Sequence, residues 1–327
     1  MEPFLDKSTG RLGALWRLGI QYWAYWVLVQ LFFGLLVVPL LLAVLGGRNA
    51  SDGLDTSVSS DYYAVVPLIS GVAGLAVATL TVWLAGRFLD RRPFSAFGFR
   101  LGAGWWLDLL FGMVLGALLI TAVFLVELGL GWVEVTGSFE THGGAPFLIA
   151  ILFPAATFVC VGMSEEMVSR GYQLKNAAEG LNHPALGPRG AILLAWFLSS
   201  VFFAVLHANN PNATLISTLN IVLAGLMLGF GYVLSGELAI PIGLHITWNF
   251  FQGAVYGLPV SGFGDFGPTL LTTEQGGPEL WTGGPFGPEG GLLIPAVMLL
   301  GISLIALWTR IRTGRVSIHT PIAEPRA

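Results

Sequence analysis

Charged side chains are scarce in this sequence, because Asp, Glu, Lys and Arg together make up only 10% of its 327 residues. A soluble domain carries roughly a quarter, so an ordinary water-soluble globule is excluded. Cysteine is nearly absent too, and the single Cys160 rules out an intramolecular disulfide. The net charge of -4 gives no support to nucleic-acid binding, and we expect no nucleic acid as a partner.

Apolar residues are abundant instead: 54% of the chain is hydrophobic and the mean hydropathy is +0.75. Several apolar runs reach about 18 residues or more, enough to cross a hydrocarbon core of roughly 30 Å. The pattern predicts an all-α, polytopic membrane bundle of about eight helices, with the lipid bilayer as its surroundings. The expected helices cover residues 20–46, 63–89, 105–131, 146–178, 190–208, 213–235, 238–256 and 291–309.

The distribution of basic residues predicts how the chain lies in the membrane. Lys and Arg gather in the cytoplasmic connections of membrane proteins. If alternate connections are assigned to the cytoplasm, 14 of the 15 basic residues lie on that side, and Arg48 is the exception. Both termini are then cytoplasmic. Residues 1–19 form a cytoplasmic N-terminal segment and residues 310–327 a cytoplasmic tail.

The remainder, residues 20–309, is predicted to be one transmembrane domain. The connection at about 257–290 is rich in Gly and Pro and is expected to be an irregular external loop. Arg outnumbers Lys by 13 to 2, which favours a bacterial origin and the bacterial cell membrane.

Ionisable residues inside a membrane span cost roughly 2.5–3.5 kcal/mol each, so each needs a partner or a function. In the expected fourth helix, Glu166 and Arg170 are four residues apart and can form an ion pair on one face. Glu165 is rotated by about 100° from Glu166 and lacks that partner. An unpaired carboxylate in an apolar site binds protons more readily, which suits a general base.

Two later helices carry further polar groups. Phe203 precedes His207 by one turn, although a lone histidine on an apolar helix is more often an ordinary core residue. His245 and Asn249 lie four residues apart and face the same direction. An interhelical hydrogen bond is the alternative to a catalytic role for this pair.

Together these residues form three ordered motifs, Glu165-Glu166-x-x-x-Arg170, Phe203-x-x-x-His207 and His245-x-x-x-Asn249, within residues 164–249. In this region the chain resembles the CAAX-protease and bacteriocin-processing (CPBP) intramembrane proteases, also called the CAAX amino-terminal protease or abortive-infection family. Each motif is weak alone, whereas three in order are specific. Outside this motif core the resemblance is only general.

The resemblance implies a peptidase and a role for each motif residue. Glu165 and His207 would activate the attacking water, His245 and Asn249 would stabilise the oxyanion, and Arg170 would orient Glu166. Members of the family are often called metalloproteases, so Glu165, His207 and His245 could hold Zn²⁺ through two imidazoles and a carboxylate. The sequence leaves a metal mechanism and a glutamate mechanism both open.

Helix lengths gave an expectation for the depth of this site. At about 1.5 Å per residue, Glu165 lies about 20 Å from residue 178, His207 about 27 Å from Arg189 and His245 only about 10 Å from residue 238. For these residues to meet, the cytoplasmic ends of the fourth and fifth helices must project beyond the bilayer. This predicts a site in the cytoplasmic half of the membrane.

The expected substrate is a membrane-tethered peptide or protein, prenylated if the source is eukaryotic. Two other classes remain open: a transporter or channel that relays protons through buried Glu and His, and a non-catalytic membrane scaffold. A transporter would place polar residues along a whole path, whereas here they cluster at three motifs.

Overall fold

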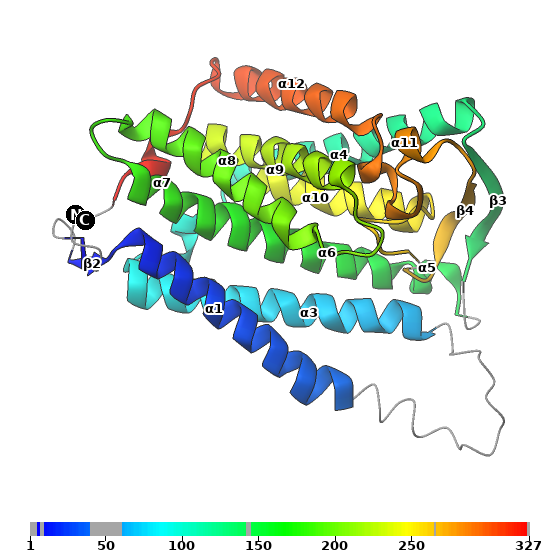
Figure 1. Ribbon diagram of the computed structural model, residues 1–327, viewed down its shortest axis with the longest axis horizontal. Coiled ribbons are helices and arrows are strands. Elements are labelled where there is room, and N and C mark those ends of the chain that lie inside the picture. Colours follow the sequence, from blue (N-terminus) through cyan, green and yellow to red (C-terminus); the bar gives the residue numbers. More distant parts are fainter. Residues whose placement is uncertain (1–4, 7–9, 40–60, 142–144, 265, 326–327) are drawn as a thin grey trace.

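The computed structural model describes residues 5–6, 10–39, 61–141, 145–264 and 266–325. Most of this part of the chain is helical, and the helices lie roughly side by side along the longest axis (Figure 1). Residues 40–46 of the first predicted helix, and Arg48, lie outside the described residues. The eight predicted helices correspond to α1 (Ala14–Phe32) with η1 (Phe33–Val37), α3 (Asp61–Leu84) with η2 (Ala85–Asp90), α4 (Ala103–Gly129), α5 (Phe147–Ala150) with α6 (Leu152–Glu166), η4 (Met167–Leu174) and α7 (Lys175–Leu181), α8 (Gly187–His207), α9 (Leu215–Ser235), α10 (Ala239–Phe250) with η5 (Phe251–Val255), and α12 (Ile294–Thr313).

Seven helices of the described chain are long and apolar enough to cross a membrane. The chain is therefore a multi-pass integral membrane protein, as the sequence predicted. The helix at 239–255 differs from the other seven because it is shorter, and residues 239–249 are all buried. It is enclosed by other helices and contributes little surface to the lipid.

α10 approaches α4 so closely that both helices need glycine at the contact. A Cβ atom at Gly112 or Gly116 of α4 would collide with backbone atoms of α10, and one at Gly243 of α10 would collide with α4. Small residues allow such close approach of helices in membranes, where dispersion forces drive the packing. The close contact fixes α10 at the centre of the bundle.

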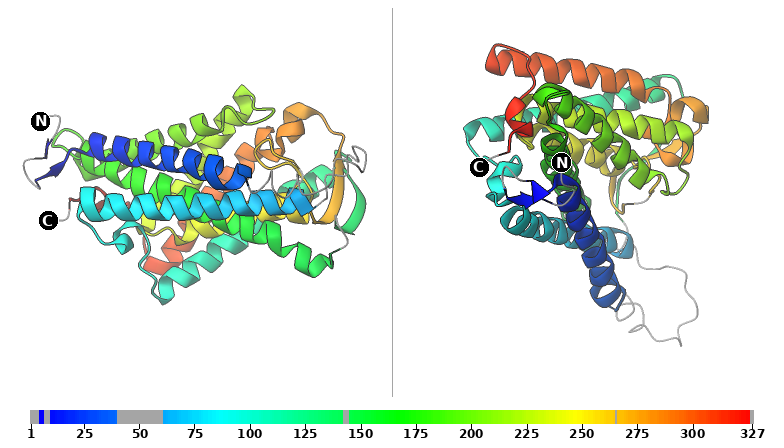
Figure 2. Two further views of the ribbon diagram at one scale, coloured as in Figure 1. Left: turned by 90° about the horizontal axis from the view of Figure 1, so that it is seen from below. Right: turned by 60° about the vertical axis from the view of Figure 1, so that its left-hand side comes forward.

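The outer helices lie on opposite sides of this centre. α1 and α12 flank the bundle on different sides, and this separation persists when the molecule is turned (Figures 1 and 2). The segment β2 (Arg11–Leu12) and the short helix η8 (Thr320–Ala323) lie at one end of the molecule. The strands β3 (Val133–Glu140) and β4 (Thr269–Gln275) lie at the other end.

These two strands correct the expectation of an irregular loop at 257–290. β3 and β4 pair in antiparallel fashion, with Val133 opposite Gln275 and Glu140 opposite Thr269. Both segments are rich in β-branched residues, which favour strands. The rest of this connection contains α11 (Glu279–Thr282) and the 3₁₀ turns η6 (Gly284–Phe286) and η7 (Pro288–Gly290). A second two-stranded sheet pairs β1 (Leu5–Asp6) with β2.

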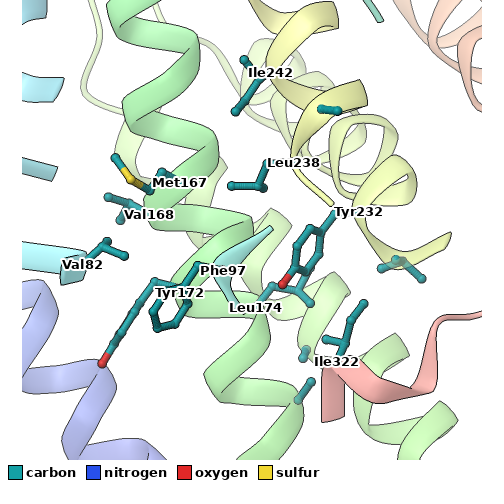
Figure 3. Packing of buried hydrophobic residues seen from close by; sticks show 14 of the residues in the cluster. Val82, Phe97, Met167, Val168, Tyr172, Leu174, Tyr232, Leu238, Ile242 and Ile322 are labelled. Atoms are coloured by element: carbon teal, nitrogen blue, oxygen red, sulfur yellow. The ribbon is translucent and has the colours of Figure 1, made fainter. Parts of the chain in front are cut away.

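A large apolar cluster packs around η4, the segment that carries Arg170. Met167, Val168 and Tyr172 of η4 pack with Phe97, from the 3₁₀ turn η3 (Phe94–Phe97), and with Leu238 (Figure 3). The rings of Phe97 and Tyr172 lie 5.5 Å apart between centroids. This packing holds η4 against the start of α10 and so sets the distance between their polar residues.

An ionic cluster lies at the end of the molecule that holds β2 and η8. Arg17 contacts Asp90 and donates to Glu179 at 3.1 Å, while Arg11 and Arg92 bond Glu179 at 2.5 and 2.6 Å. All five side chains are buried, and their shared hydrogen bonds offset much of the desolvation cost. The cluster joins β2 and α1 to η2 and α7.

Candidate active site

The first motif lies where α6 passes into the π-helical segment η4. Glu166 is fully buried, and its Oε1 accepts a hydrogen bond from Arg170 Nη1 at 2.9 Å, as the spacing predicted. Arg170 also donates to the carbonyl of Gly225 at 3.3 Å, and its guanidinium lies 4.5 Å from the ring centroid of Phe203. The ion pair thus links η4 to α9 and α8.

His245 of the third motif joins this pair. Its Nδ1 lies 2.9 Å from Glu166 Oε1, so the carboxylate that binds Arg170 also accepts a hydrogen bond from the imidazole N–H. The Nδ1 bond orients the ring and leaves Nε2 facing Glu165, whose Oε2 lies 3.9 Å away. Glu165 has a side chain that is 34% exposed, whereas Glu166 is fully buried. Adjacent glutamates therefore occupy different environments.

His207 of the second motif is the last residue of α8. Its Nδ1 lies 2.8 Å from the carbonyl oxygen of Phe203, which requires a proton on Nδ1. The neutral ring therefore has its lone pair on Nε2, where it can accept a proton. The ring packs against Phe203 with centroids 4.5 Å apart.

One cavity brings the second and third motifs together. His207, His245 and Asn249 line it, with Trp248 and Phe203 beside them. The i, i+4 spacing of His245 and Asn249 places both on the same wall, as predicted. Glu165 approaches His245 but is not among the residues that line this cavity.

Two lining residues come from the connection after η5 and were missed by the sequence analysis. Ser261 and Glu289 contribute to the cavity wall, although no helical periodicity or motif spacing marks them. Glu289 is only 4% exposed, and Asn220 of α9 donates to its backbone carbonyl at 2.8 Å. The connection at 257–290 therefore forms part of the candidate site.

The carboxylate of Glu289 is held by neutral donors. Gln252 Nε2 donates to Oε2 at 2.7 Å and the backbone N–H of Ser261 donates at 3.0 Å. Gln252 lies on η5, two turns beyond His245. Burial raises the pKa of Glu289, and the hydrogen bonds from Ser261 and Gln252 oppose that rise only in part.

The cavity lies near the end of α8 and far from its start, as the length of that helix predicts. α8 runs away from the end that holds β2 and η8, so His207, with Ser261 and Glu289, lies toward the opposite end (Figure 1). α10 begins close to the end that holds η8, because Gly236 lies against His319 and Leu238 bonds the carbonyl of Gly98. His245 follows Leu238 by about 10 Å along the helix. The depth of the site in the membrane stays a prediction.

The predicted zinc ligands are not gathered into one group. In the described part of the chain, no three His, Cys, Asp or Glu side chains are arranged to hold a metal ion. His245 uses Nδ1 for Glu166, and His207 uses Nδ1 for a carbonyl, so each has only Nε2 left for a ligand. A free Nε2 with Nδ1 bonded to a carboxylate or a carbonyl is the usual state of a zinc-binding histidine, but the described structure does not bring Glu165, His207 and His245 together around one point. Metal dependence stays a prediction.

Comparison with known proteins places the motifs in a family. Residues 146–251 match the Rce1-like type II CAAX prenyl endopeptidases. This segment contains all three motifs, so the resemblance inferred from them is confirmed. The matched family is one of CAAX prenyl endopeptidases, and Ser261 and Glu289 lie beyond the matched residues.

A bacterial relative covers nearly the whole chain. The uncharacterized protein YyaK of Bacillus subtilis is 26% identical over 288 residues, which is 86% of this chain and 90% of YyaK. The relative agrees with the expected bacterial membrane. No solved structure matches the chain significantly.

Proposed function

We propose that this protein is an intramembrane endopeptidase that hydrolyses a peptide bond of a membrane-tethered peptide or protein. The observation that carries the proposal is the arrangement of His245, which is held by Glu166 at Nδ1 and presents Nε2 toward Glu165, in a cavity shared with His207 and Asn249. A structural hydrogen bond between helices would require only one of these contacts.

In the proposed reaction, water attacks the scissile carbonyl carbon. Glu165 takes the proton from water, and the lone pair on Nε2 of His207 orients the water. The distance between Glu165 and His207 is expected to shorten when substrate binds, because catalytic hydrogen bonds often tighten only in the complex. Glu165 then delivers the proton to the leaving amine nitrogen.

The negative charge that develops on the carbonyl oxygen needs donors. Asn249 supplies its carboxamide N–H, and His245 supplies Nε2–H in its imidazolium form, which the two neighbouring glutamates favour. In other proteases one such donor contributes roughly 2.7–4 kcal/mol to transition-state stabilisation. Arg170 neutralises Glu166 and thereby keeps the imidazole in place.

The test uses purified protein and a pool of prenylated and unprenylated membrane peptides, with fragments read by mass. Wild-type protein is expected to produce fragments that the Glu165→Gln variant does not. The prenylated half of the pool shows whether the lipid is required. Identical fragments from both proteins would reject the role of Glu165, and no fragments from either protein would favour a transporter or a scaffold.

A further inference from the structure

The cavity contains one ionisable group that the proposed reaction does not use. Glu289 reaches it from the connection between η5 and α12, on the wall that also carries Ser261. In the described part of the chain, the hydrogen-bond donors to its side chain are neutral, and His207 of the same cavity acts on it only from beyond ion-pair distance. A buried carboxylate without a cation in direct contact keeps much of its desolvation cost.

The two carboxylate oxygens of Glu289 differ in the hydrogen bonds that they accept. Oε2 accepts from Gln252 and from the backbone of Ser261, whereas the side-chain bond to Oε1 is a longer one, 3.4 Å from Ser261 Oγ, and the backbone N–H of Glu289 itself also bonds the carboxylate. The two bonds to Oε2 fix the direction of the carboxylate and leave Oε1 available. A donor that enters the cavity could therefore bind Oε1 without displacing an existing bond.

The rest of the lining suits the aliphatic part of a long cationic side chain. Apolar residues of three helices contribute to the cavity: Met227 and Leu228 of α9, Leu244 of α10 and Met298 of α12. Lys and Arg pack their methylene stems on apolar surface while the charged end seeks a polar partner. The cavity offers such a surface with one carboxylate.

We infer that Glu289 binds a Lys or Arg side chain of the substrate near the scissile bond, and so selects a basic residue there. The inference rests on the proposed function, because it places this side chain in the cavity of the protease site. The cation would satisfy Oε1 and would neutralise the buried carboxylate. Glu289 is then a specificity-determining residue contributed from outside the family match.

The test measures binding, so it does not depend on cleavage. A membrane-anchored peptide series carries Lys at successive positions, and each member has a twin with acetyl-lysine, which lacks the charge. Binding is measured to the intact Glu165→Gln protein. At one position the Lys peptide is expected to bind roughly 10- to 100-fold more tightly than its twin, the range for a hydrogen bond to a charged group.

Adding Glu289→Gln should bring the two affinities, for the Lys peptide and for its acetyl-lysine twin, to about the same value, since glutamine keeps the shape of glutamate but lacks its charge. Glu289→Asp should retain a preference for Lys. Glu274→Gln is the matched control, because Glu274 is an exposed residue of β4 in the same connection and does not line the cavity. It should leave the ratio unchanged.

Two outcomes would overturn the inference. One is the absence of a Lys preference at every position, and the other is an unchanged preference in the Glu289→Gln protein. If Glu289→Gln lowers thermal stability and weakens both twins equally, Glu289 serves only to hold the connection in place, which also rejects the inference. Failure of the proposed function would instead appear as wild-type protein that binds but cleaves no peptide.

Discussion

Glu166 is the residue on which the motif contacts converge. Its Oε1 accepts from Arg170 and from His245, both at 2.9 Å, and all three side chains are buried. Removing one charge from a buried pair leaves the other without a partner, which is more costly than losing an exposed ion pair. We therefore expect the two glutamates of the first motif to have separable roles, a structural one for Glu166 and a chemical one for Glu165.

Glu166→Gln should therefore destabilise the protein. The expected loss in free energy of unfolding is about 3–5 kcal/mol, because Arg170 keeps its charge in a buried site. Denaturation followed by circular dichroism measures it. The double variant with Arg170→Met should recover part of the loss, and a single variant as stable as wild type would contradict the assigned role of Glu166.

Asn249→Ala should act on the reaction and leave the fold intact. Loss of one oxyanion donor is expected to lower kcat roughly 10²–10³-fold with little change in KM. Asn209→Ala is a suitable control, because Asn209 is exposed and lies outside the cavity lining. A variant at Asn249 with a normal kcat would remove this residue from the proposed oxyanion site.

At the scale of elements, the position of α10 decides the geometry of the site. Its Gly243 packs against α4, and Gly112 and Gly116 of α4 allow the same close approach. His245 and Asn249 depend on this packing, because α10 presents them to the cavity only when its other face is packed against α4. Displacement of α10 would move both residues.

Gly116→Ala tests this dependence. The added methyl group would collide with the backbone of α10, and overpacking of this kind costs about 1–3 kcal/mol. We expect lower thermal stability together with lower peptidase activity. Gly129→Ala on the same helix is the control, because open space surrounds Gly129. Equal behaviour of the two variants would show that the α4–α10 contact does not position the site.

The helices were predictable because each is encoded by a local apolar run, and the i, i+4 pairs were predictable because they lie on one helix. The pairing of β3 with β4 was not, since it joins segments more than a hundred residues apart. Glu289 was missed for the same reason: only the folded connection brings it to His207. The depth of the site in the membrane stays a prediction.

At the scale of the whole molecule, the described segments nearest the two ends of the chain, β2 and η8, lie at the same end of the bundle (Figure 1). This agrees with an even number of spans. The side of the membrane on which that end lies stays a prediction from the distribution of Lys and Arg. If the prediction holds, β3 and β4 lie on the outer side of the membrane.

Labelling of introduced cysteines measures this orientation. Cys160 is the one native cysteine, so Cys160→Ala gives a suitable background. A membrane-impermeant maleimide applied to intact cells should label Glu274→Cys on β4 and should not label Arg315→Cys beyond α12 until the cells are broken. Both positions are exposed. The reverse pattern would place the termini outside.

Hydrolysis is the central claim, and cleavage in ¹⁸O-labelled water tests it most directly. Wild-type protein in vesicles would be incubated with the membrane-peptide pool, and the fragments would be read by mass. The account predicts fragments whose new carboxyl terminus carries one ¹⁸O atom. In Glu165→Gln the cleavage rate should fall by about 10²-fold or more, the contribution of a general base. Unlabelled fragments, or equal yields from both proteins, would contradict it.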